Sequence, residues 1–265
     1  MKFRAFLTPL LFLTLGLSGL TAGETPTAQS LTEHLDMLRR PPSSFEVKVT
    51  VNELHDGKTT QTSIFRVMAG KRPGSSAFDA MALCQEPAAD RGKTVLTQGK
   101  EIWFFDPKGK HPTQISAHHF RGKFYALDSI STNLNADYSS DIVGEETIKD
   151  AARTEVTCVV LRLHRREKNS LGMNTDVIDF WLDKKFYQPI RAQFYGSGNK
   201  IQRTVYYAGY SKVLGETRPT RLLVVSNTER GLVTDVKFSD YTLHDWPADL
   251  FTKGAMEKVS HGEMP

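Results

Sequence analysis

Short segments in which apolar and polar residues alternate constrain the fold of this chain more than any other feature. The first such segment places an apolar residue at every second position of residues 45–51. Successive side chains of a β-strand point to opposite faces, so this period of two predicts a half-buried strand. The Asp56-Gly57 pair that follows is typical of a two-residue hairpin turn, and residues 59–69 then predict the partner strand.

The same pattern recurs to the end of the chain and predicts about eleven strands. Most of their connections are short, which favours antiparallel neighbours, because parallel strands need a long crossover. We therefore expect one mainly β domain of the α+β class, whose sheet closes, curls or is covered at its edges. The other strands are expected at residues 75–84, 95–97, 102–105, 156–163, 177–182, 190–195, 201–210, 222–225 and 232–241.

One clear helix precedes these strands. Ser30 stands three residues before Glu33, which is the spacing of a capping box, and Pro41 and Pro42 end the segment. Leucines at helical spacing between these signals predict a short amphipathic helix with one apolar stripe. Residues 108–150 show mixed spacing and are expected to form loops with one or two short helices. The stripe consists of Leu31, Leu35 and Leu38.

The N-terminus has the three parts of a secretory signal. Lys2 and Arg4 precede an apolar run at residues 5–20, and three small residues follow. We expect cleavage of residues 1–23, which leaves one domain over residues 24–265. An uncleaved membrane anchor is the alternative, although the run is short for a span. No cysteine follows the small residues, so no lipid attachment is expected there.

The chain has two cysteines, Cys84 and Cys158. An exported protein meets an oxidising compartment, so these residues are expected to form one disulfide; two separate buried thiols are the alternative. The formal net charge is +4, and the signal carries two of these positive charges. This charge is too small to predict nucleic-acid binding.

The sequence contains no recognisable motif of catalysis or metal binding. Residues 91–94 resemble the end of a phosphate-binding loop, but Pro87 occupies a position that requires glycine, and a strand follows in place of a helix. The histidines His111, His118 and His119 cluster, but adjacent residues on a strand point apart. We expect no enzyme activity, no metal and no cofactor.

Several strands present large apolar side chains on one face. A sheet this wide has more apolar surface than the few expected helices cover, so part of that face is predicted to line a cavity for an apolar ligand. A closed, packed core is the alternative. The predicted lining residues are Ile102, Phe104, Ile178, Phe180, Leu182, Ile190 and Phe194.

Several segments together resemble the outer-membrane lipoprotein-sorting proteins, which are LolA-like periplasmic carriers. They cover most of the chain after the predicted signal, and the Trp-Leu-Asp-Lys stretch is the most specific of them. The segments are Trp103-Phe104-Phe105-Asp106-Pro107, Phe180-Trp181-Leu182-Asp183-Lys184, residues 187–195, Arg218-Pro219-Thr220 and residues 246–251.

This resemblance implies an open, unclosed antiparallel β-barrel with helices over its concave mouth. It also implies a carrier that holds lipid or lipoprotein acyl chains in a Gram-negative periplasm, without catalysis. From its cleaved signal the mature protein is expected to be soluble, and we expect it to be a monomer. An inner-membrane transporter is an expected partner. The alternative is an adaptor or sensor that binds a membrane exporter through the same surface.

Overall fold

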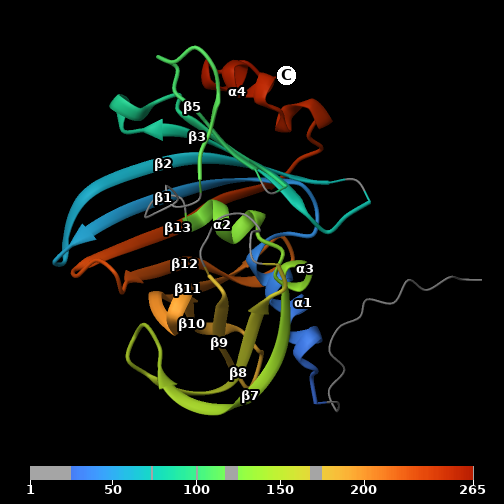
Figure 1. Ribbon diagram of the computed structural model, residues 1–265, viewed down its shortest axis with the longest axis vertical. Coiled ribbons are helices and arrows are strands. Elements are labelled where there is room, and N and C mark those ends of the chain that lie inside the picture. Colours follow the sequence, from blue (N-terminus) through green and yellow to red (C-terminus); the bar gives the residue numbers. More distant parts are fainter. Residues whose placement is uncertain (1–24, 73, 100, 117–124, 168–174, 265) are drawn as a thin grey trace, which may run out of the picture.

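The computed structural model describes residues 25–72, 74–99, 101–116, 125–167 and 175–264 (Figure 1). The predicted signal lies outside these residues, as do His118 and His119. The described part of the chain is mainly β, with a few short helices, as the sequence predicts.

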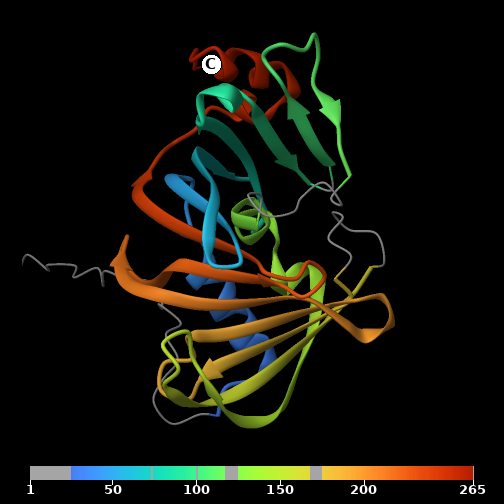
Figure 2. The ribbon, with the colours of Figure 1, turned by 90° about the vertical axis from the view of Figure 1, so that its left-hand side faces the viewer.

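Thirteen strands of the described residues form one antiparallel sheet, which curls without closing (Figures 1 and 2). Their order is β6-β5-β4-β3-β2-β1-β13-β12-β11-β10-β9-β8-β7. Two meanders therefore meet where β1 pairs with β13, and β6 and β7 form the two edges. The strands are β1 (Phe45–His55), β2 (Lys58–Lys71), β3 (Phe78–Glu86), β4 (Thr94–Gln98), β5 (Glu101–Phe105), β6 (Thr113–Gln114), β7 (Tyr138–Lys149), β8 (Glu155–Arg165), β9 (Val177–Asp183), β10 (Pro189–Gly196), β11 (Lys200–Val213), β12 (Glu216–Ser226) and β13 (Leu232–Leu243).

The predicted number of eleven strands is too low, because β6 and β7 fall in the stretch that was expected to hold only loops and short helices. β7 is a long edge strand whose residues are mostly exposed on both faces. A strand with water on both sides has no alternation of apolar and polar residues to reveal it. The hairpin at Asp56-Gly57 is confirmed: both residues have positive φ, as a tight two-residue turn between β1 and β2 requires.

The helices divide between the two faces of the sheet (Figure 1). Three of them pack inside the concavity, where α2 lies across the curled strands, and α4 covers the outer face of β3–β5. The α-helices of the described residues are α1 (Ala28–Arg39), α2 (Tyr125–Ser131), α3 (Leu134–Asp137) and α4 (Lys253–Ser260), and the 3₁₀ turns are η1 (Ala88–Asp90), η4 (Ser197–Asn199) and η5 (Ala248–Phe251).

The cap of α1 differs from the prediction. The helix begins at Ala28, and the Thr27 hydroxyl accepts a hydrogen bond from the Ser30 backbone N–H at 3.1 Å. Thr27 is therefore the N-cap, and Ser30 lies inside the first turn. The apolar stripe is as expected, with Leu31, Leu35 and Leu38 buried against the sheet.

Two apolar layers hold the sheet between its helices. The larger one fills the concave side, where α1 and α2 pack against strands from β1 to β13. The second lies outside, between β2–β5 and the segment of η5 and α4. At Gly70 of β2, a Cβ atom would lie 2.1 Å from the Phe251 ring. Only glycine at this position lets the aromatic ring of η5 lie directly on the strand.

The predicted disulfide is wrong: no disulfide joins Cys84 to Cys158 in the structure. Cys84 on β3 belongs to the concave-side core, whereas Cys158 on β8 belongs to a small cluster on the outer face. Seven strands separate β3 from β8 in the sheet order. A disulfide requires Cα atoms within about 7 Å and Cβ atoms that point toward each other, and this arrangement provides neither.

Within the part of the chain that the structure describes, no helix has the length and hydropathy to cross a membrane.

Candidate binding cavity

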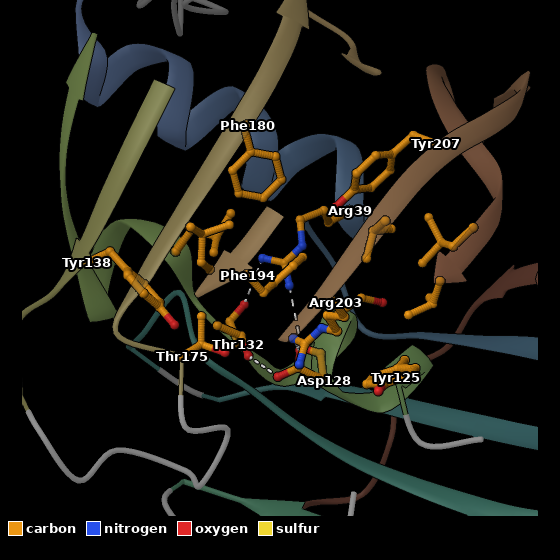
Figure 3. A pocket seen from close by; sticks show the side chains of 16 residues that line it. Arg39, Tyr125, Asp128, Thr132, Tyr138, Thr175, Phe180, Phe194, Arg203 and Tyr207 are labelled. Carbon is orange, nitrogen blue, oxygen red and sulfur yellow. Dashed lines mark hydrogen bonds and ion pairs between the residues drawn. The ribbon is translucent and has the colours of Figure 1, made fainter. Parts of the chain in front are cut away.

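A small cavity lies on the concave side, between the curled sheet and the helices (Figure 3). Its walls come from β9–β12, from α1, and from α2 with the residues that follow it. The space that admits the centres of water molecules is about 40 Å³, which is room for about three waters. A cavity of this size is too small for an acyl chain.

The predicted lining residues divide into three groups. Ile178, Phe180 and Phe194 line the cavity. Ile102 and Leu182 belong to the same concave core, beyond the cavity walls. Phe104 is partly buried against that core, and Ile190 is separate from it.

Ile190 points to the outer face, where it packs beside Trp181. The pairing of β10 with β9 shifts between Pro189 and Arg191, so that a β-bulge inserts one residue into β10. A bulge breaks the alternation of faces along a strand. The expectation that Ile190 shares a face with Phe194 is therefore wrong.

Aromatic rings form the apolar end of the cavity (Figure 3). The Phe180 ring centroid lies 6.4 Å from that of Phe194 and 6.3 Å from that of Tyr207. Phe180 is only 1% exposed. Burial raises the pKa of Tyr207 to about 12, so its hydroxyl stays neutral near neutral pH.

Two arginines at the end of α1 hold α2 over the cavity. Arg40 Nη1 donates to the Ile130 carbonyl oxygen at 2.9 Å and to the Thr132 carbonyl oxygen at 3.2 Å. Arg39 donates to the carbonyl oxygens of Asp128 and Thr132, both at 3.4 Å. The last carbonyl groups of a helix lack partners within the helix, so Arg40 supplies a donor to that of Ile130. The Asp128 carbonyl oxygen also accepts a hydrogen bond from the Thr132 backbone N–H at 3.0 Å. Burial lowers the pKa of Arg40 to about 10, so it remains charged at neutral pH.

A third arginine, Arg203 on β11, enters the cavity from the sheet. Its guanidinium carbon lies 3.9 Å from the centre of the Phe194 ring and 5.0 Å from that of Tyr125. Its Nη2 atom forms an ion pair with the Asp128 carboxylate of α2 at 3.3 Å. Arg203 is 6% exposed. A desolvated charge of this kind needs a counter-charge close by.

Two hydroxyl groups complete the polar end of the cavity. Tyr138 accepts a hydrogen bond from Arg165 Nη2 at 2.7 Å, and burial raises the pKa of its hydroxyl to about 12. Thr175 is 1% exposed, and its hydroxyl has no hydrogen-bond partner among the described residues. Buried hydroxyl groups without partners are rare and costly.

Four further residues line the cavity that were not predicted from the sequence: Arg39, Asp128, Thr175 and Arg203. Arg203 carried a usable signal, because it alternates with Val205 and Tyr207 on one face of β11. A charged residue in an otherwise apolar register marks either a bulge or a functional group. Asp128 and Thr175 carried no such signal, since their roles depend on where α2 and the start of β9 lie.

The chemistry of the cavity is that of binding by apolar contact and by cationic donors. Among the described residues, no group of three or more histidine, cysteine, aspartate or glutamate side chains is placed to hold a metal ion.

Comparisons with known proteins give the family. A protein-family model, described as a family of uncharacterized proteins, matches residues 78–258. A LolA superfamily protein from Nitrosomonas europaea has 26% sequence identity and a TM-score of 0.74, covering 87% of this chain and 99% of that protein. Among curated proteins, none matches this chain.

Two further solved structures share the fold. A DUF1329 family protein from Desulfovibrio piger has 18% identity and a TM-score of 0.71, covering 86% of this chain and 97% of that one. A domain assigned to outer membrane lipoprotein-sorting proteins, from Vibrio parahaemolyticus, has 18% identity and a TM-score of 0.70 with the same coverage of 86% and 97%.

The curled, open sheet with helices in its concavity therefore defines a protein of LolA-like architecture. The chain belongs to the LolA-like family.

Proposed function

We propose that this protein is a periplasmic carrier that holds the acyl chain of a lipid or lipoprotein in its concave cavity, without catalysis. The observation that carries the proposal is the apolar cavity beneath α2. Its cover is attached by the packing of Leu127 and Ile130 and by side-chain hydrogen bonds from Arg39 and Arg40, not by strand pairing. Such a cover can move away while the sheet stays intact. The likeness to a domain assigned to lipoprotein-sorting proteins supports the same class of cargo.

Loading in this proposal requires α2 to move outward. The closed cavity of about 40 Å³ has to grow several-fold to admit an acyl chain. Ile178, Phe180 and Phe194 then form the sheet side of the acyl site. Residues 1–23 serve as a cleaved signal that exports the carrier to the periplasm, where an inner-membrane transporter is its expected donor.

Filling the cavity tests the proposal. Val224 is 2% exposed and lines the cavity from β12. We expect Val224→Phe to reduce the affinity for a fluorescent acyl probe, such as a pyrene-labelled fatty alcohol, at least tenfold, because the added ring occupies the acyl site. The matched control is Val236→Phe on β13, which belongs to the same core without lining the cavity.

The measurement is a fluorescence titration of both variants under conditions where each unfolds cooperatively. Equal affinities in the two variants and the parent would show that the cavity is not the acyl site. Failure of the parent to bind the probe, together with no lipid in native mass spectra, would favour the adaptor function.

A further inference from the structure

The cavity holds a permanent positive charge whose counter-charge sits on the movable cover. Arg203 belongs to β11, in the middle of one sheet meander, and cannot leave without disrupting the strand. Its ion-pair partner Asp128 belongs to α2. If α2 opens as the proposed function requires, Asp128 moves away and Arg203 stays.

This separation has an electrostatic cost. Arg203 is stacked on Phe194 and almost fully buried. Removing the Asp128 carboxylate takes the opposite charge of this ion pair away from a buried guanidinium, which is costly. A neutral acyl chain in the opened cavity adds apolar surface beside that charge and supplies no counter-charge. A cargo that carries an anion at the right end of its chain restores the pair.

Two hydroxyl groups lie at the same end of the cavity as this charge, and the Arg39 guanidinium lies between that end and the aromatic one (Figure 3). Figure 3 shows Arg203, Asp128, Thr175 and Tyr138 along one side, with Phe180 and Tyr207 at the opposite end. The Thr175 hydroxyl, which has no partner among the described residues, is a hydrogen-bond donor available to a ligand. One end of the cavity is thus suited to an anionic oxygen and the other to a hydrocarbon.

We propose that the cargo is an amphiphile with an anionic headgroup, a carboxylate or a phosphate, which replaces Asp128 as the partner of Arg203 when α2 opens. This inference rests on the proposed carrier function and specifies its ligand. Asp128 then acts as a placeholder that keeps Arg203 neutralised in the empty protein. Charge-assisted hydrogen bonds of this kind are about twice as strong as neutral ones, so the headgroup contributes to selectivity as well as to affinity.

Three ligands with the same chain test the proposal: hexadecanoate, hexadecyl phosphate and hexadecanol, each titrated below its aggregation concentration. We expect at least one of the two anions to bind at least tenfold more tightly than the alcohol. The tighter anion identifies the headgroup as carboxylate or phosphate. Arg203→Gln should remove this preference while the alcohol still binds.

A second variant keeps the test decisive if Arg203→Gln does not fold. Asp128→Asn removes the competing carboxylate and also one attachment of α2 to the sheet. We therefore expect it to increase the affinity for all three ligands, and to increase that for the preferred anion at least threefold more than that for hexadecanol. The control is Arg221→Gln, which breaks the ion pair with Asp235 on the outer face of the sheet and should leave all three affinities unchanged.

The outcomes separate the two proposals. Equal binding of all three ligands, unaffected by the variants, would overturn the anionic headgroup and leave the carrier function standing. Binding of none of them would contradict the carrier function itself, and the headgroup with it.

Discussion

A single arginine fastens the first helix to the sheet. Arg218 on β12 is 1% exposed. It donates to the carbonyl oxygens of Met37 and Leu38 at 2.8 and 3.3 Å, at the C-terminal end of α1. Burial lowers the pKa of Arg218 below its usual value. Its role is to satisfy helix carbonyls that would otherwise be buried without partners.

Replacing Arg218 should therefore destabilise the fold. We expect Arg218→Met to lower the free energy of unfolding by about 2–3 kcal/mol. Each lost hydrogen bond from a charged donor costs about 1.5–3 kcal/mol. Part of this loss is offset, because the variant no longer buries the Nη2 atom, which has no partner among the described residues. Urea denaturation measures the change. Arg221→Met, which removes a half-exposed ion pair, should cost at most about 1 kcal/mol. Equal losses in the two variants would contradict this role.

Single residues show what the sequence could and could not reveal. Arg218 belonged to a recognisable motif, Arg218-Pro219-Thr220, but its hydrogen bonds to α1 depend on a helix far away in the chain. Phe180 and Phe194 were predicted to share a face, and they do. Ile190 was assigned to that face by strict alternation. The bulge that turns it outward depends on pairing with β9, which one strand alone does not encode.

At the scale of elements, α2 depends on α1 for its position. Arg40 bonds the carbonyl oxygens of both Ile130 and Thr132 and also donates to the Ser76 carbonyl oxygen at 3.3 Å. α2 has seven residues, and an isolated helix of that length is unstable in water. Its order therefore comes from these hydrogen bonds and from the burial of Leu127 and Ile130.

Loss of these bonds should loosen α2. We expect Arg40→Met to accelerate hydrogen exchange of the α2 backbone amides at least tenfold, because local opening no longer breaks two charge-assisted hydrogen bonds. Exchange in α4, on the other face of the sheet, serves as the internal control. The matched variant Arg66→Met removes an ion pair with Glu46 between β1 and β2 and should not affect α2. Unchanged α2 exchange in Arg40→Met would show that apolar packing alone holds this helix.

Helices and strands were predictable where one face is exposed to solvent and the other is buried. The leucine stripe of α1 and the alternation in β1 and β2 meet this condition. β7 does not, because water reaches both of its faces. α4 was missed because its buried residues Ala255, Met256 and Val259 form a stripe of less than two turns, and its packing on β3–β5 depends on the long-range course of the chain.

For the whole molecule, the open, curled shape was expected from the resemblance to a family and the antiparallel meander from the short connections, but the junction between the two meanders was not predicted. A meander predicts neighbouring strands from neighbouring segments. The pairing of β1 with β13 joins the two ends of the strand sequence, and no local pattern encodes it. The same long-range geometry determines where the two cysteines lie. An oxidising compartment favoured a disulfide between them, but the sheet places them on opposite faces.

The cysteine arrangement makes a direct prediction. Unfolding the protein in denaturant without reductant should release two titratable thiols. In the native protein, burial raises the pKa of Cys158 to about 11, so little thiolate exists near neutral pH and this residue should react slowly with thiol reagents. Thiol titration of native and unfolded samples gives both results. If the unfolded, unreduced protein contained no titratable thiol, the two cysteines would have to be joined in a disulfide.

The β1–β13 ladder also determines the order in which the domain is completed. Every other ladder joins strands that are consecutive in the chain. Each meander can therefore form its strand pairs locally as soon as its own residues are available. The β1–β13 ladder forms only when residues near Leu243 contact those near Phe45. Closing so long a loop is slow. Until then two half-sheets each present an unprotected edge, which is a site for aggregation. During synthesis, the most vulnerable state of this chain is therefore the one that lacks only its final strand.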